Sequence, residues 1–164
     1  MTAISKPQTS MAQAGKYLTF ALGDEEYGIE ILKVREIVGC LDITPVPRTE
    51  PHVKGVVNLR GQVISVMDLR TAFGMNEVPR TEQTCIIVLE VRRDGRKVSC
   101  GMVVDRVREV LNITESQIEP PPDLGAAVQG GCILGMGKVG DRVKILLDID
   151  AVLGFASEGA ARAA

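Results

Sequence analysis

The chain has 164 residues, of which 45% are hydrophobic and 24% are charged, so it has the composition of an ordinary globular protein. A formal net charge of -2, with 3% aromatic residues and no Trp, argues against a nucleic-acid-binding surface. The apolar runs are too short to cross a bilayer, and the N-terminus lacks the apolar segment of a signal peptide. We therefore expect a cytoplasmic protein of one domain, or of two small halves that share a core.

Strand patterns dominate the chain between two irregular ends. Residues 1–15 and 155–164 are small or polar without periodicity, so we predict a disordered N-terminal tail and a flexible C-terminal tail around a folded region, 16–154. Alternating hydrophobic residues separated by turn residues predict four hairpins, over 18–31, 56–67, 84–104 and 132–149. The last hairpin strand is expected to turn four side chains toward the core: Val143, Ile145, Leu147 and Ile149.

Three further segments have a different character. Short helical patterns begin at Asp68 and at Asp148, and we interpret both carboxylates as helix caps. The proline-rich segment 119–123 is incompatible with regular strand pairing, so we predict a loop there.

The chain also repeats itself. Residues 27–37 align without a gap on 100–110, with a shared Gly followed by Val-Arg-Glu and an aliphatic residue, and 66–74 align on 146–154. The two matches come in the same order, which indicates a duplication with halves at about 16–74 and 84–154. About five short strands for each half predict an all-β fold, with two intertwined five-stranded barrels of the SH3-like or OB-like type and short helices.

No pattern in the chain points convincingly to catalysis. Residues 135–140 form a literal G-x-G-x-x-G, but a strand pattern follows where a nucleotide-binding loop needs a helix, so we predict a glycine-rich hairpin turn. The single histidine, His52, is interpreted as a solvated loop residue. The four cysteines lack C-x-x-C spacing and are expected to be buried free thiols. We predict no catalytic residue, no metal site and no cofactor.

The two halves differ at one hairpin. Asn58-Leu59-Arg60-Gly61 in the first half is expected to correspond to the segment 134–138 in the second, with inserted residues. Since duplication allows one copy to specialise, Arg60 at the hairpin tip is a candidate interface residue. The residues alone slightly favour the alternative, an ordinary solvated charge.

Several strings together resemble the CheW family of chemotaxis coupling proteins, and the resemblance extends over residues 16–154. It implies a non-catalytic adaptor, a monomer that joins arrays with chemoreceptor cytoplasmic tips and with the regulatory domain of the histidine kinase CheA, without inserting into the membrane. The strings that carry the resemblance are 20–37, 53–61, 66–70, 101–105 and 146–149.

The resemblance also implies a site. Residues matching Val34, Glu36, Gly55 and Arg60 are associated with receptor or kinase coupling in the family. We add Asn58, beside Arg60, and Val103. We expect apolar residues near Val34 and Val103 to accept a receptor helix, and the second barrel to contact the kinase. A Glu36–Arg60 ion pair would contribute about 1 kcal/mol at most.

Two other classes of function stay open at this point. One is a small enzyme or ligand-binding barrel that uses a groove as a pocket. The other is the regulatory domain of a kinase expressed alone, or a relative that carries a receiver domain, for which the chain is expected to be too short.

Overall fold

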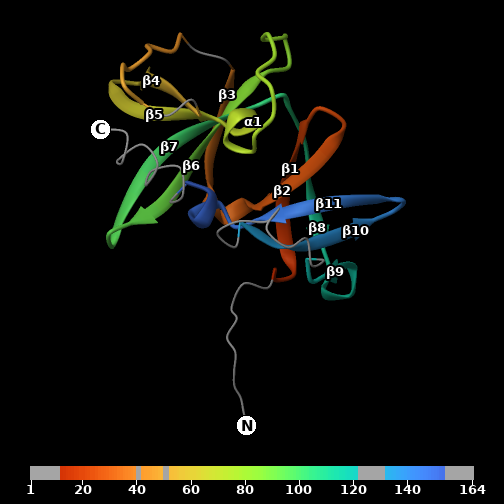
Figure 1. The fold of residues 1–164 in the computed structure, drawn as a ribbon. Helices are drawn as coiled ribbons and strands as arrows, with labels where there is room; N and C mark the ends of the chain where they lie inside the picture. The colour runs from red at the N-terminus through yellow and green to blue at the C-terminus, as the bar shows by residue number, and fades with distance from the viewer. Residues whose placement is uncertain (1–11, 40–41, 50–51, 122–131, 154–164) are drawn as a thin grey trace.

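The structure is a computed structural model that describes residues 12–39, 42–49, 52–121 and 132–153. Strands make up most of these residues, and the hairpins β6–β7 and β10–β11 extend on opposite sides of the molecule (Figure 1). The strands are β1 (Gly15–Leu22), β2 (Glu25–Glu30), β3 (Val34–Gly39), β4 (Val53–Leu59), β5 (Gln62–Asp68), β6 (Cys85–Arg93), β7 (Arg96–Val104), β8 (Arg106–Ile113), β9 (Ile118–Glu119), β10 (Ile133–Val139) and β11 (Arg142–Leu147). The short helices are η1 (Ile31–Lys33), α1 (Leu69–Ala72) and η2 (Glu115–Gln117), and residues 149–153 are also helical.

All four predicted hairpins are confirmed. They are the antiparallel pairs β1–β2, β4–β5, β6–β7 and β10–β11, and each closes through two residues. Arg60 and Gly61, at the β4–β5 turn, both have positive φ angles, 52° and 87°. This combination is typical of the type I′ turn, whose twist matches that of the strands it joins.

The strands form two sheets, and each sheet takes strands from both halves of the repeat. Sheet A has the order β8-β1-β2-β11-β10-β9, and sheet B has the order β3-β6-β7-β5-β4. The halves meet in two parallel pairings, β2 with β11 and β5 with β7. The predicted all-β class with short helices is confirmed, although sheet A has six strands and not five because β9 adds two residues at its edge.

The two parallel pairings are the same contact made twice. Gly28 lies opposite Leu146 in sheet A, and Gly101 lies opposite Val66 in sheet B. A Cβ on Gly28 would lie 2.9 Å from Leu146 Cδ2, and a Cβ on Gly101 would lie 2.8 Å from Ile86 Cγ2. Glycine at these repeat-related positions therefore allows the side chains of the neighbouring strand to pack directly over the backbone.

Three apolar clusters hold the sheets. The cluster of sheet B draws side chains from all five of its strands, which means that the sheet curls around its own core. Sheet A curls in the same way around a second cluster, to which its edge strands β8 and β9 both contribute. The third cluster contains side chains of both sheets, among them Phe20, Leu147 and Met102, and we call it the shared core. The expectation that the two halves share a core is thus confirmed.

The prediction for the last strand was wrong in part. Val143 is 49% exposed, whereas Lys144 and Leu146, which the alternation placed outside, are buried. Strand β11 lies between β2 and β10, so both of its faces are covered: Leu146 packs in the cluster of sheet A, and Leu147 packs in the shared core. A strand that is buried on both faces does not follow a simple alternation.

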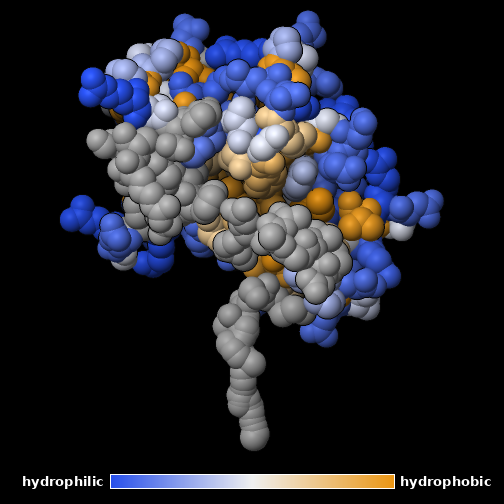
Figure 2. All heavy atoms as spheres, viewed as in Figure 1, coloured by the Kyte–Doolittle hydropathy of each residue, from blue (hydrophilic) through white to orange (hydrophobic). Residues whose placement is uncertain are grey.

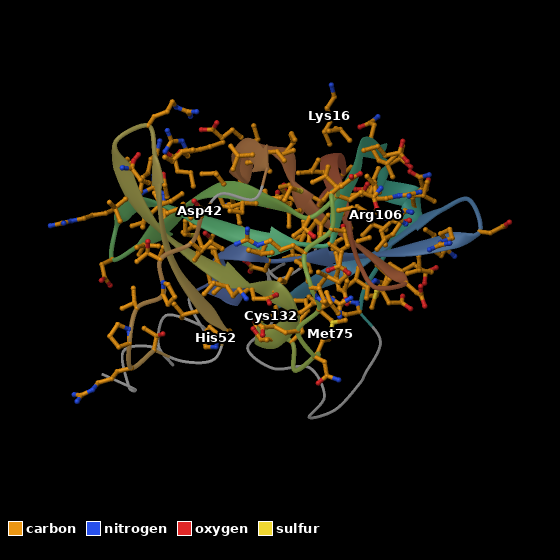
Figure 3. The ribbon with its side chains drawn as sticks, turned by 90° about the horizontal axis from the view of Figure 1, so that it is seen from above. Lys16, Asp42, His52, Met75, Arg106 and Cys132 are labelled. Carbon is orange, nitrogen blue, oxygen red and sulfur yellow. The ribbon has the colours of Figure 1, made fainter. Side chains whose placement is uncertain are left out.

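The idea of inserted residues in the second half was also wrong. Strands β4 and β10 have seven residues each, and each has a register shift that ends at a glycine, Gly55 or Gly135. The backbone N–H of Asp68 donates to the carbonyl of His52, and that of Asp148 donates to the carbonyl of Cys132. His52 and Cys132 lie at the same edge of the molecule seen from above (Figure 3). The two segments are therefore equivalent throughout, and the counterpart of Arg60 is Gly140.

The remaining sequence interpretations have mixed outcomes. The G-x-G-x-x-G segment was predicted to be a hairpin turn, but residues 135–139 lie in strand β10 and only Gly140 is in the turn. Glu119 pairs with Met136, so the predicted loop begins one residue later; 122 and 123 lie outside the described residues. His52 is half-buried, more enclosed than the solvated loop residue expected.

Both helix caps are confirmed. The Asp68 carboxylate accepts a hydrogen bond of 2.9 Å from the N–H of Arg70, and Asp148 accepts one of 3.2 Å from the N–H of Ala151. At the chain ends, the N–H of Ala12 donates to the carbonyl of Leu134, and Gly15 begins β1, whereas residues 1–11 and 154–164 lie outside the described part. Within the described part, no helix has the length and apolarity to span a membrane.

The close packing at Gly101 makes a prediction about stability. We expect Gly101→Ala to lower the free energy of unfolding by about 1–3 kcal/mol, because the new methyl group would collide with the branched side chains of Ile86 and Val66. Gly28→Ala should cost less, since its nearest neighbour is the end of the flexible Leu146 side chain. Urea denaturation monitored by circular dichroism measures both effects.

Gly39→Ala is the matched control. Gly39 ends β3, is exposed, and a Cβ there would meet no atom within 4 Å. Its variant should unfold at the same urea concentration as the original protein or at a slightly higher one. Equal stability of Gly101→Ala and Gly39→Ala would contradict the packing argument.

Candidate interaction site

The six predicted site residues all lie on sheet B, and they divide into groups with different surroundings. Val34 and Glu36 are on β3, Gly55 and Asn58 are on β4, Arg60 is in the β4–β5 turn, and Val103 is on β7.

Glu36 and Arg60 form an ion pair between Oε2 and Nη2. The pair joins the tip of the β4–β5 hairpin to β3, which is at the other end of the sheet order. The Arg60 side chain is 67% exposed and that of Glu36 is 25% exposed, so the pair lies at the surface and contributes little to stability. The contact brings an exposed guanidinium to a defined place beside the edge strand.

Asn58 holds the turn that carries Arg60. Its side-chain Oδ1 accepts a hydrogen bond of 2.8 Å from the backbone N–H of Gly61. Arg60 has a φ of 52°, in the left-handed region that non-glycine residues seldom adopt, so the turn needs such local support. Asn58 therefore positions Arg60 through the backbone.

Gly55 has a structural role in this geometry. It is buried, its φ is 144°, and a Cβ there would lie only 2.0 Å from the carbonyl oxygen of Thr44. Thr44 exchanges two backbone hydrogen bonds of 2.9 Å with Val56, so the segment that contains Thr44 lies antiparallel alongside β4, next to Gly55. Any larger residue would push this segment away from the sheet.

The structure does not bring Val34 and Val103 onto one surface. Val34 lies opposite Leu89 and packs against the shared core, whereas Val103 lies opposite Ile86 and packs in the cluster of sheet B. Both are half-buried. Of the two, only Val34 adjoins the strand segment that carries Glu36.

Val103 instead lines a small pocket of about 40 Å³. The pocket contains both charged and apolar side chains, including Lys54, Asp68 and Val78. Burial raises the pKa of Asp68, and the hydrogen bond from the backbone N–H of Arg70 partly offsets this effect. Known ligand pockets are roughly 300–1,000 Å³, so this one has space for only a few atoms.

A charged contact that the sequence reasoning missed ties the two sheets together. Arg70, in α1, donates from Nε and Nη2 to the two carboxylate oxygens of Asp105, at 2.9 and 2.7 Å. Asp105 also accepts a hydrogen bond of 2.7 Å from the N–H of Gly23, in the β1–β2 turn of sheet A.

Figure 2 shows apolar residues gathered in the middle of the viewed face, in the region where Figure 1 places α1.

A similar contact with the opposite polarity exists in the other half. Asp150, the repeat counterpart of Arg70, binds Lys33 of η1 at 2.7 Å. In the first case α1, in the first half, is joined to the residue that follows the β6–β7 hairpin of the second half. In the second case the helix at 149–153 is joined to η1, which follows the β1–β2 hairpin of the first half. The partners are 35 residues apart in the first case and 117 in the second, so no local pattern marks them.

Among the described residues, no three His, Cys, Asp or Glu side chains are placed to hold a metal ion. Of the four cysteines predicted to be buried thiols, Cys100 is buried, Cys85 and Cys132 are half-buried, and Cys40 lies outside the described residues; the three described ones form no disulfide with one another.

Comparison with known proteins identifies the family. Residues 16–156 match the CheW-like domain. The chain belongs to the CheW family. It is 42% identical over 138 residues to the chemotaxis protein CheW of Klebsiella aerogenes, covering 84% of this chain and 81% of that one. The chemotaxis protein CheW of Bacillus subtilis is 33% identical over 138 residues, covering 84% and 86% of the two chains.

A solved structure supports the same assignment. The scaffolding protein TtCheW from Thermoanaerobacter tengcongensis superposes with a TM-score of 0.75 at 34% identity, covering 85% of this chain and 92% of that one. The family and its relatives make the chain a chemotaxis coupling adaptor, which is the function class that the resemblance of its sequence implied.

The Arg70–Asp105 pair predicts a pH-dependent stability. The hydrogen bonds from Arg70 hold the pKa of Asp105 below its usual value. The ionised carboxylate therefore stabilises the folded state above the unfolded pKa of about 4, and this contribution is lost as the pH falls through the lower folded pKa. We expect Asp105→Asn to cost about 1–3 kcal/mol at neutral pH, and the difference from the original protein to shrink below about pH 4.

Denaturation at a series of pH values measures this difference. Asp94→Asn is the control, because Asp94 is exposed in the β6–β7 turn and Asn tolerates its positive φ. A pH-independent difference between Asp105→Asn and the original protein would show that the pair is not what stabilises the fold.

Proposed function

We propose that this protein is a non-catalytic cytoplasmic adaptor that couples the cytoplasmic tips of chemoreceptors to the histidine kinase CheA. In this proposal it is a monomer that joins receptor arrays, and residues 16–154 act as a single CheW-like unit between two tails. The observation that supports it most directly is the Glu36–Arg60 pair on sheet B, within a fold that resembles a solved scaffolding protein.

The receptor is assigned to the part of sheet B around Val34, Glu36 and Arg60. A helix that packs on this edge would find an apolar side chain at Val34 and a charged rim at Arg60. Because Asn58 holds the turn and Glu36 holds the guanidinium, Arg60 loses little conformational freedom on binding.

Several features favour an adaptor over an enzyme. The pocket beside Val103 is about 40 Å³, well below the size of metabolite sites. The buried carboxylate of Asp68 caps a helix, and that of Asp105 is engaged by Arg70. Signal transfer would then occur through changes in packing between proteins, and no covalent bond would be made or broken.

Charge reversal at the hairpin tip tests the receptor site. We expect Arg60→Glu to abolish receptor-dependent kinase activity, because it places a second negative charge against Glu36, while the melting temperature stays within a few degrees of the original. Co-sedimentation with receptor cytoplasmic fragments, with CheA autophosphorylation as the readout, measures the loss.

The double variant Glu36→Arg with Arg60→Glu restores the pair with its charges exchanged. Recovery of binding there would show that the pair matters mainly for geometry, and continued loss would show that the guanidinium itself touches the partner. Arg96→Glu, at the exposed β6–β7 turn, is the control for the change in net charge. Full coupling by Arg60→Glu would refute the assignment of the site.

A further inference from the structure

Each half of the repeat gives one hairpin to the other half. Hairpin β1–β2 lies between β8 and β11 of the second half, and hairpin β6–β7 lies between β3 and β5 of the first. The two hairpins are repeat counterparts, and so are the strands that flank them, β3 with β8 and β5 with β11. Because the strand pairing is similar in both sheets, backbone contacts alone do not determine which hairpin occupies which place.

A buried ion pair distinguishes the two places. Glu26, on β2, lies opposite Lys144, on β11, and the Lys144 ammonium donates to Glu26 Oε1. Both side chains are 8% exposed. The hydrogen bond from Lys144 lowers the pKa of Glu26 against the effect of burial, so the carboxylate is ionised at neutral pH. The repeat-equivalent positions in sheet B hold Ser99 and Ile64, and neither is charged.

Glu26 is approached by cations from both strands that flank its hairpin. Arg108 Nε, on β8, lies 3.4 Å from Glu26 Oε2, and Arg142 Nη2, on β11, lies 3.7 Å from the same oxygen. In sheet B the counterpart of Arg108 is Arg35, which donates to the Ser99 hydroxyl at 2.6 Å. The carboxylate on hairpin β1–β2 is therefore matched to the two second-half strands beside it.

Thr19 makes a second contact that only one of the hairpins can supply. It is fully buried on β1, where the pairing with β8 shifts register between Leu18 and Phe20. Its hydroxyl donates to the carbonyl of Glu109 at 2.8 Å and accepts from the N–H of Glu109 at 3.1 Å. The repeat counterpart of Thr19 is Val88, which has no hydroxyl. Hairpin β6–β7 would leave both of these Glu109 groups without that partner.

An exchange of the two hairpins would also separate the ion pair. Lys144 would then lie opposite Ser99, and Glu26 would lie opposite Ile64. Glu90, which pairs with Ser99 on β6, would be one strand further from the Lys144 ammonium. Separating a buried pair is much more destabilising than replacing both members by uncharged residues, because the remaining charges stay buried without compensation.

We propose that the Glu26–Lys144 pair, supported by Thr19, directs hairpin β1–β2 into sheet A and excludes hairpin β6–β7 from that place. The pair thus selects one of two similar strand arrangements that a duplicated chain makes possible, which is the role for which buried polar pairs are best suited. The inference concerns how the chain folds, and it does not depend on the partners proposed above.

The test uses the double variant Glu26→Ser with Lys144→Ile, which gives sheet A the residue types that sheet B has. After refolding of the full chain from urea, we expect the population with exchanged hairpins to rise at least about tenfold, because the mismatch that disfavours it is gone. The urea midpoint should stay the same or rise, since an uncharged pair replaces a desolvated charged one. Amide NMR spectra measure the two populations, and cross-strand nuclear Overhauser contacts between β2 and β5 identify the exchanged form.

Two further variants separate this effect from a simple loss of stability. If the double variant folds poorly, Glu26→Gln with Lys144→Met removes both charges with little change of shape and should give the same rise. Adding Ser99→Glu and Ile64→Lys to the double variant moves the pair to sheet B. The two places then differ again, so the exchanged population should fall toward that of the original protein.

The control is Glu119→Ser with Lys138→Ile, which makes the same substitutions at an ion pair within the second half. That pair joins β9 to β10 at 2.6 Å, and both side chains are 54% exposed, so its loss should leave refolding unchanged. An exchanged population that stays at the original level in both variants without the charges would overturn the inference. A lower urea midpoint with faithful refolding, or an equal rise in the control, would overturn it as well.

Discussion

The parallel pairing of β2 with β11, repeated between β7 and β5, is the contact on which this fold depends. Through it each half of the repeat gives strands to both sheets, so neither sheet is complete without the other half. Gly28 and Gly101 allow the strands to pack this closely, because a side chain at either position would occupy space already filled by its neighbours. The two halves are thus joined through both sheets and through one shared core.

The same symmetry shows where the two halves have diverged. The helix-to-connection ion pairs join the same elements in the two halves but have opposite polarity, Arg70 with Asp105 and Asp150 with Lys33. Arg70 and Asp150 are repeat counterparts, whereas Lys33 aligns with Arg106, one residue after Asp105. What the fold requires here is an attraction between two elements, and either arrangement of charges supplies it.

The surfaces of the two sheets have also diverged in charge on a similar backbone, and this affects what each sheet can bind. In sheet B the hairpin tip carries Arg60 and reaches Glu36 on the far strand. In sheet A the counterpart of Arg60 is Gly140, and the charges lie deeper, around Glu26. A buried pair such as Glu26–Lys144 costs desolvation energy that an apolar pair would not, so its presence in one sheet only is better explained by positioning than by stability. Two similar frameworks therefore present two chemically different surfaces.

The sequence by itself determined the hairpins, their turns, the helix caps and the duplication, because these depend on residues close together in the chain or on direct similarity between segments. It also indicated the family, through strings that are contiguous. Only the tertiary structure decided which half contributes which strand to each sheet, that β11 is buried on both faces, and that Val34 and Val103 face different clusters. It alone revealed the Arg70–Asp105 contact and the group around Glu26, since their members are far apart in the chain and local periodicity carries no information about such distant partners.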